Sequence, residues 1–230
     1  MKEIASIRLK NDREELLPAF SPDFPYIASR AYLDRYEVPW HWHRAVELFY
    51  LERGALTYAT PCGETVLPEG AGGLVNAGVL HATRPLEQGA EAVQLLHTFE
   101  PDFLSGGADT LIGRRYIAPL TSSSIELLPI LPEDGAGAEI LTMLRASFSL
   151  SEREFGYELR LRDALSAIWL RLLALGQPAS LPKADPEEER RVKAMLRFMD
   201  EQYGRNLRVS DIAGAAFISE RECFRIFRRG

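Results

Sequence analysis

Residues 39–47 read Pro39-Trp40-His41-Trp42-His43-Arg44-Ala45-Val46-Glu47 and form the most informative stretch of the chain. In a β-strand the side chains of residues i and i+2 point to the same face, so His41 and His43 converge on one point. If the strand continues, Glu47 shares that face; if a tight turn follows His43, Glu47 lies on the neighbouring strand, still within reach. Two imidazoles and a carboxylate in this arrangement suit a divalent metal such as Zn, Ni, Mn or Fe. The alternative is a polar pocket that these side chains line as hydrogen-bonding groups.

The region around this stretch, from residue 27 to about residue 99, favours short strands. It is rich in Val, Leu, Tyr, Phe and Trp, and turn signals interrupt it at Arg53-Gly54, Pro61-Cys62-Gly63, Pro68-Glu69-Gly70 and Asn76-Ala77-Gly78. Short β-prone runs with a turn about every 8–12 residues predict an antiparallel sandwich or barrel. His81 follows the last of these turns and adds a third imidazole to the candidate site.

The composition is that of a globular protein. Of the 230 residues, 46% are hydrophobic and 26% are charged, and no apolar run reaches the ~18 residues that a membrane span needs. The first residues, Met1-Lys2-Glu3-Ile4, lack the apolar core of a secretory signal. The two cysteines, Cys62 and Cys223, are far apart in sequence, so we expect a reduced, cytoplasmic protein without membrane contact.

Helical patterns follow the β-rich region. Residues 139–150 and 155–175 are predicted to be helices, and apolar side chains form one stripe on the second: Leu161, Leu165, Ile168, Trp169 and Leu172. The stripe either packs on its own domain or forms the seam of a dimer. Residues 116–132, which contain three prolines and a Thr-Ser-Ser-Ser run, are predicted to be a loop.

A change in charge accompanies a predicted linker. The segment Gln177 to Pro186 contains three prolines, which block helix continuation, and separates an acidic body from a basic end. From Glu187 to Gly230 there are ten Lys/Arg against eight Asp/Glu, whereas the preceding residues carry 17 against 25. A basic end favours nucleic-acid binding weakly, since a solvated helix face has the same composition.

The last 22 residues predict two short helices joined by a turn. Val209 to Ala215 has small residues where two helices approach, and Ser219-Glu220-Arg221-Glu222 is a capping box that begins the second helix. We expect Phe217 and Ile218 to fill the angle between the helices. We also expect three apolar side chains to anchor the second helix: Phe224, Ile226 and Phe227. A helix-turn-helix presents such a second helix to the DNA major groove, although the same hairpin occurs as a plain packing unit.

Two known families resemble these patterns. His41-x-His43-x3-Glu47-x6-Gly54 is similar to the first motif of the cupin superfamily, and the stretch from Pro68-Glu69-Gly70 to His81 is similar to its second motif. The resemblance implies a small β-barrel with a central pocket, and it places His41, His43, Glu47 and His81 at the ligand positions of metal-binding cupins. The long interval from Gly70 to His81, and the lack of an asparagine after His81, look more like the sensory cupins of transcription factors. Many of those sensors bind no metal.

The C-terminal residues resemble the first helix-turn-helix of the AraC/XylS family of bacterial transcription regulators. The matching pattern is Leu207-x-Val209-x-x-Ile212-Ala213, then Ile218-Ser219, then Phe224-Arg225-x-Phe227-Arg228-Arg229. That family commonly carries a sensory cupin ahead of its DNA-binding domain. The resemblance implies a second helix-turn-helix beyond Gly230, without which we expect poor DNA binding, because half of the phosphate contacts are missing.

The sequence therefore predicts an α+β protein that regulates transcription and is not an enzyme. Residues 1–176 form a cupin-type ligand-sensing and dimerisation domain, 177–187 a linker, and 188–230 the first helix-turn-helix of an incomplete DNA-binding domain. The predicted pocket or metal residues are His41, His43, Glu47 and His81. The predicted DNA-binding residues are Ser219, Arg221, Glu222, Arg225, Arg228 and Arg229.

The predicted partners are promoter DNA, a second copy of the chain, and a small-molecule effector such as a sugar or an aromatic metabolite. Trp40, Trp42 and Tyr50 offer a stacking surface for a sugar. The two tryptophans have the opposite parity to the histidines, so packing outside the barrel is the alternative for them. The rival function is a metal-dependent cupin enzyme, of the dioxygenase or isomerase type, that uses the same four ligands.

Overall fold

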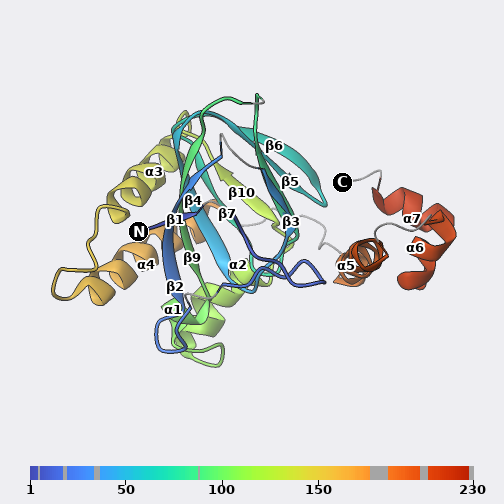
Figure 1. The fold of residues 1–230 in the computed structure, drawn as a ribbon. Helices are drawn as coiled ribbons and strands as arrows, with labels where there is room; N and C mark the ends of the chain where they lie inside the picture. Colours follow the sequence, from blue (N-terminus) through green and yellow to red (C-terminus); the bar gives the residue numbers. More distant parts are fainter. Residues whose placement is uncertain are drawn as a thin grey trace.

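The computed structural model describes residues 1–4, 6–17, 20–33, 37–87, 89–176, 186–202 and 207–227. Ten strands form two sheets (Figure 1). The larger sheet has the order β1-β2-β9-β4-β7-β10 and the smaller one β3-β8-β5-β6. The strands are β1 Lys2–Ile4, β2 Tyr26–Tyr32, β3 Val38–His41, β4 Val46–Arg53, β5 Leu56–Thr60, β6 Gly63–Leu67, β7 Gly72–Val75, β8 His81–Pro85, β9 Val93–Phe99 and β10 Leu127–Ile130.

Alternation along the strands gives the larger sheet two buried faces. On β4, Phe49 and Leu51 belong to the core between the sheets, whereas Val46 and Leu48 belong to a core on the opposite face. Successive strand residues point to opposite faces, so this run of apolar side chains serves both cores. We therefore describe the β domain as two facing sheets: the ladder pairings of the described strands do not close them into the predicted barrel. The short strand β3, with its shift of register between Val38 and His41, forms one edge of the smaller sheet.

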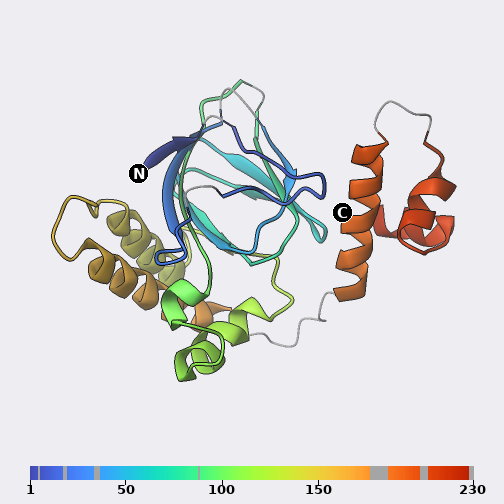
Figure 2. The ribbon, with the colours of Figure 1, turned by 60° about the horizontal axis from the view of Figure 1, so that its bottom comes forward.

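Helices cover the outer face of the larger sheet (Figure 2). These are α1 Asp102–Ser105, the π-helix η1 Gly113–Ile117, α2 Ala118–Thr121, α3 Gly135–Ser147 and α4 Tyr157–Leu175. All five residues of the predicted stripe on α4 are buried in the core beneath it. The stripe therefore packs on its own domain, and the prediction that it forms a dimer seam is wrong. Among the described residues, no helix is long and apolar enough to cross a membrane.

A buried histidine joins α3 to the larger sheet. The side chain of Ser147 on α3 donates to the Leu144 carbonyl at 2.6 Å, so its Oγ accepts from His97 Nε2–H at 2.8 Å. The Tyr26 hydroxyl then donates to His97 Nδ1 at 2.6 Å. Burial lowers the pKa of His97 to about 3, which keeps the ring neutral and this chain of hydrogen bonds intact.

The predicted loop at 116–132 is wrong in two places. Residues 118–121 form α2, and Leu127–Ile130 form β10, which pairs antiparallel with β7. The prediction missed β10 because of Pro129, since proline has no backbone N–H to donate to a hydrogen-bonded strand ladder. It is tolerated here because β10 is the outermost strand of its sheet.

Three further helices lie on the other side of the β domain, away from α3 and α4 (Figures 1 and 2). They are α5 Pro186–Glu201, α6 Val209–Ala215 and α7 Glu220–Phe227. Their shared core consists of Val192, Met195, Ala213, Ala216, Cys223 and Ile226, and it includes Leu80 of the β domain. Residues 177–185 of the predicted linker, 177–187, lie outside the described part of the chain.

Candidate metal centre and ligand pocket

The structure brings together His41, His43, Glu47 and His81 from both sheets. His41 ends β3 and pairs directly opposite His81, the first residue of β8. The chain bends after His43, so Glu47 lies on β4 in the other sheet, as the turn alternative predicted. All four side chains are buried, and their candidate ligand atoms lie within 4.8 Å of one another.

Backbone carbonyls fix the tautomers of the three histidines. Nδ1 of His41 lies 2.9 Å from the carbonyl oxygen of Pro39, and the equivalent distances are 2.9 Å for His43 and 3.0 Å for His81. A carbonyl oxygen only accepts, so each Nδ1–H donates and each neutral ring carries its lone pair on Nε2. Within the described part of the chain, Nε2 of His43 and of His81 is buried without a hydrogen-bond partner. A buried, unpaired polar atom is costly, and lone pairs that converge are satisfied by a metal ion.

Glu47 completes the set of ligands. Its Oε1 accepts from the Tyr58 hydroxyl at 2.8 Å, and Gln94 donates to that hydroxyl in turn. Its Oε2 lies 3.7 Å from Nε2 of His43 and 3.8 Å from Nε2 of His81, beyond hydrogen-bond range. Two ligands of one tetrahedral zinc ion are about 3.4 Å apart. The three imidazoles and the carboxylate therefore fit a divalent metal, with small adjustments.

The charges in this cluster are coupled. Burial alone raises the pKa of Glu47, but the neighbouring His43 and His81 outweigh burial and hold that pKa below its usual value. Burial lowers the pKa of His41 well below its usual value, and the other two imidazoles add to this effect. Burial also lowers the pKa of His43, yet the Glu47 carboxylate reverses the balance and raises it. An ionised Glu47 beside a neutral His41 is the protonation state that metal binding requires.

Glu15 is a neighbour of the cluster that the sequence did not suggest. Its Oε2 lies 3.8 Å from Nε2 of His41, and its backbone N–H donates to the Trp42 carbonyl at 2.8 Å. Burial raises the pKa of Glu15 to about 7, against the influence of His43. In sequence it stands in the charged run Asp12-Arg13-Glu14-Glu15, which has the pattern of a solvated segment.

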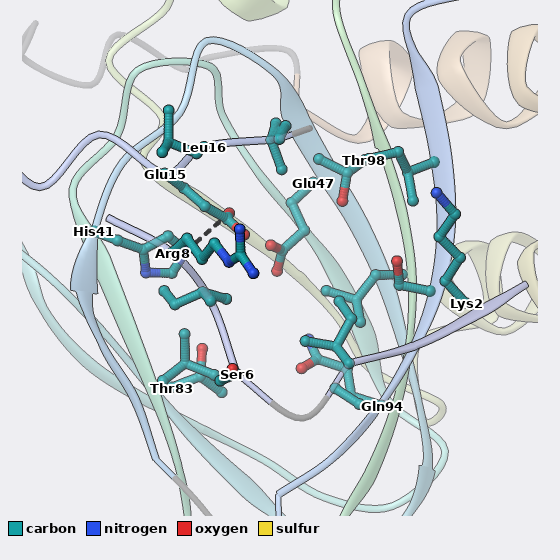
Figure 3. A pocket seen from close by; sticks show the side chains of 18 of the residues that line it. Lys2, Ser6, Arg8, Glu15, Leu16, His41, Glu47, Thr83, Gln94 and Thr98 are labelled. Atoms are coloured by element: carbon teal, nitrogen blue, oxygen red, sulfur yellow. Dashed lines mark ion pairs between the residues drawn. The ribbon is translucent and has the colours of Figure 1, made fainter. Parts of the chain in front are cut away.

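A cavity of about 300 Å³ opens from the cluster into the space between the sheets (Figure 3). His41 and Glu47 line it, together with polar side chains of the strands: Ser29, Thr83, Gln94 and Thr98. Its apolar wall includes Ile27, Ala31, Val38 and Leu96, and residues 2–4, 6–8 and 15–17 form its rim.

The predicted aromatic stacking surface is not part of this cavity. Trp40 and Trp42 pack against the cluster formed by α5, α6 and α7, as the alternative of packing outside the barrel predicted. Tyr50 packs in the core beneath α3 and α4. None of the three is among the cavity's lining residues, so a sugar in this cavity would not stack on them.

The two predicted short helices at the C-terminal end are present as α6 and α7. Ser219 Oγ accepts from the Glu222 backbone N–H at 3.2 Å, as expected of a helix cap. At the start of α6, the Asp211 carboxylate accepts from the Arg208 N–H at 3.1 Å. Arg221 is exposed, whereas Arg225 donates to both carboxylate oxygens of Glu222 at 2.9 and 2.6 Å. Arg228 and Arg229 lie outside the described residues.

The predicted aromatic anchors of these helices are wrong. Phe217 is 97% exposed, and Phe224 and Phe227 are 52% and 44% exposed. The predicted packing of Ile226, which is buried, and of Ile218, which is partly buried, is confirmed, and Cys223, which the prediction missed, is buried beside them. Residues three apart share a face of a helix, so with 223 and 226 facing the core, 224 and 227 turn outward together.

Helix α5 contacts the loops that carry the cluster. Lys193 Nζ lies 4.2 Å from the centre of the Trp42 ring and donates to the Gly78 carbonyl at 2.7 Å. The Gly78 N–H in turn donates to the His43 carbonyl at 2.8 Å. A short path of direct contacts therefore joins the cluster to the C-terminal helices.

Comparison with known proteins agrees with this organisation. The model of the AraC-like ligand binding domain matches residues 24–169. The uncharacterized HTH-type transcriptional regulator YdeC of Bacillus subtilis (strain 168) is 23% identical over 194 residues, which cover 84% of this chain and 65% of YdeC. The chain thus spans about 65% of the length of this curated relative.

Solved structures resemble the chain at lower sequence identity. Apo ToxT K231A from Vibrio cholerae is 15% identical, covers 89% of this chain and 78% of its own, and has a TM-score of 0.50, which indicates a shared fold. The AraC-like transcriptional activator CuxR is 12% identical over 80% of this chain and 61% of its own, with a TM-score of 0.37. The family model covers more than half of the sequence, and the chain therefore belongs to the AraC-like ligand-binding domain family.

Proposed function

We propose that the chain is a ligand-responsive, DNA-binding transcription regulator of the cytoplasm. Residues 1–176 sense a small molecule, and residues 188–230 contribute the first helix-turn-helix. The observation that carries this proposal is the order of parts: the buried cluster lies within the matched ligand-binding domain, the strands of that domain line the cavity together with the N-terminal segment, and two short helices follow in the same chain.

The sensor pocket holds a divalent metal. Nε2 of His41, His43 and His81 and Oε2 of Glu47 are its ligands, supported by the three carbonyl contacts and by Tyr58. Carbonyl and hydroxyl partners of this kind orient metal ligands and fix their protonation. When bound, the metal supplies a fixed positive charge and a Lewis-acidic position for a ligand.

The second helix of the pair, α7, is the recognition helix. Ser219 and Arg221 stand at its exposed N-terminal end, the end that contacts bases in helix-turn-helix proteins. Arg225 pairs with Glu222 in the free protein, and DNA phosphates compete for this guanidinium. Arg228 and Arg229 follow α7 in the sequence, and we assign them to phosphate contacts.

Effector binding reaches α5 through the loops that carry His43. Lys193 contacts Trp42 and Gly78, and Gly78 is hydrogen-bonded to His43. A ligand that favours one arrangement of these loops shifts the population of DNA-competent molecules.

The chain forms a dimer through the outer face of α4, opposite its buried stripe. Leu159 and Leu170 are 75% and 52% exposed on this helix. An apolar pair on an otherwise polar outer face is a candidate contact with a second copy.

A paired measurement tests this function. Fluorescence anisotropy with DNA from upstream of the protein's own gene is expected to give weak, salt-dependent binding. Arg221→Ala should weaken it further, and Arg153→Ala, at an exposed arginine far from α7 in sequence, should not. Metal-dependent turnover of oxidisable or isomerisable substrates, with no DNA binding, would instead support the rival cupin enzyme. Equal DNA binding by both variants would contradict the role of α7.

A further inference from the structure

The four candidate ligands are unequally placed around the cavity. His41 and Glu47 line it, whereas His43 and His81 are not among its lining residues. A metal held by all four would accept a further ligand only by expanding to five or six coordination, and His41 and Glu47 are the ligands that face the cavity from which such a ligand would come. Glu15 also lines this cavity (Figure 3).

The charged residues that line the cavity favour an anion only when a metal is present. They are two bases and three acids: Lys2, Arg8, Glu3, Glu15 and Glu47. Their formal sum without metal is zero or one negative charge, according to whether Glu15 is protonated, and a divalent metal makes the sum positive in both cases. Lys2, Glu3 and Arg8 are exposed, so solvent screens their charges, whereas a metal held by the buried cluster would act more strongly on a ligand.

Arg8 is available to a ligand. Its side chain reaches from the N-terminal segment toward the cavity (Figure 3) and has no ion pair within the described part of the chain. A guanidinium presents paired N–H donors that match a carboxylate. Lys2, at the rim of the same cavity, adds a second positive charge.

The size and the lining of the cavity limit the rest of the ligand. A volume of about 300 Å³ is at the small end of the range for small-molecule pockets. Ile27, Val38 and Leu96 offer an apolar wall, and Thr83 and Thr98 offer hydroxyls beside it. These surfaces suit a short carbon skeleton with one or two polar substituents.

We infer that the effector of this pocket is a small organic acid whose carboxylate ligates the bound metal, with Arg8 as its second positive partner. The inference rests on the proposed metal-holding function, and it separates this effector class from neutral sugars. It requires that the acid bind the metal-loaded protein and not the metal-free protein.

Thermal unfolding of zinc-loaded and metal-stripped protein tests this inference. The probes are lactate, malate, salicylate and 2-hydroxy-4-methylpentanoate, each compared with its own neutral amide. We expect at least one acid to raise the Tm of the zinc-loaded protein by several degrees at 100 times its Kd. The amides should have no effect, and no acid should stabilise the stripped protein. Equal effects of acid and amide, equal stabilisation without metal, or no response to any acid would each overturn the inference.

The metal content is measured first and again after each titration, so that failure of the metal site is distinguished from failure of the effector assignment. A protein that holds no zinc refutes the proposed metal centre itself. A protein that keeps its zinc but ignores the acids refutes only the effector class.

Arg8 variants test the second contact. Arg8→Gln should weaken binding of the responding acid about tenfold and leave zinc content unchanged, and Arg8→Lys should recover part of the loss. Arg153→Gln, which removes an exposed arginine that does not line the cavity, is the control. Unchanged affinity in Arg8→Gln would refute the role of Arg8.

Discussion

The ammonium of Lys193 on α5 lies 4.2 Å from the centre of the Trp42 ring, and Trp42 directly precedes His43 of the candidate metal cluster. Alternation along residues 40–43 accounts for this relationship. His41 and His43 turn toward the cluster, and Trp40 and Trp42 turn toward the C-terminal helices. One short segment therefore contacts both the candidate sensor site and the candidate DNA-binding part.

Removal of the Lys193 contact is expected to loosen α5. Lys193→Met loses a cation–π contact worth about 0.5–2 kcal/mol and the hydrogen bond to the Gly78 carbonyl. Hydrogen–deuterium exchange should rise several-fold in α5 and stay constant in α4. Arg190→Met, an exposed residue on the same helix, is the matched control. Unchanged exchange in α5 would mean that the contact does not hold this helix.

Tyr58 is expected to tune the metal site without contacting the metal. Tyr58→Phe keeps the stacking on Phe49, whose ring centre is 4.4 Å away, and removes the hydrogen bond to Glu47 Oε1. Loss of such a partner lowers metal affinity about 10–100-fold. Zinc competition titrations measure the change. Tyr26→Phe removes another buried hydroxyl, at His97, and should leave the zinc affinity unaltered.

His97 is expected to make the fold sensitive to acid. Its pKa is about 3 in the folded chain, because it is buried, and about 6.5 when unfolded. Below pH 6.5 the unfolded state takes up a proton that the folded state does not, so stability is complete above pH 6.5 and is lost as pH falls toward 3. From pH 6.5 to 5 the loss is about 2 kcal/mol.

Urea unfolding at pH 7 and pH 5 measures this contribution. The His97→Gln protein should be less stable at pH 7 but should lose less stability on acidification than the wild type. Equal losses in the two proteins would show that His97 does not control the acid response.

The outer face of α4 is expected to carry the dimer contact. Leu170→Glu places a charge on an exposed position and should shift sedimentation from dimer to monomer without lowering Tm. Leu172→Glu, on the buried stripe, should instead unfold the domain. A wild-type chain that sediments as a monomer at all concentrations would contradict the proposed dimer.

Strand periodicity and turn signals indicated the candidate metal cluster, and the resemblance to the cupin motifs supported the same four residues. Residues two apart in a strand point to the same face wherever the strand begins or ends, so the His-x-His spacing predicted that the two imidazoles converge. The turn after His43 was one of the two alternatives for the position of Glu47. Glu15, Tyr58 and Arg8 were missed because their roles arise from tertiary contacts across sheets, and nothing in their local sequence marks them. The stripe on α4 predicted a buried face but did not say which surface would cover it.

The errors at the C-terminus have a similar origin. Phe224, Ile226 and Phe227 are all apolar, and composition alone does not say which of them faces the core. The positions of α5 and α6 select Cys223 and Ile226 and leave the two phenylalanines outside. The helices that pack against α7 therefore determine which of its side chains are buried, and the sequence of α7 alone does not.

The metal content of protein that is loaded with zinc and then dialysed tests the candidate sensor site most directly, with three proteins compared side by side. After zinc loading and dialysis, we expect one equivalent of zinc in the wild type, none in His43→Gln, and one in His97→Gln, whose histidine lies outside the cluster. A folded wild-type protein that retains no metal, or a His43→Gln protein that retains as much as the wild type, would contradict the assignment of the cluster as a metal centre.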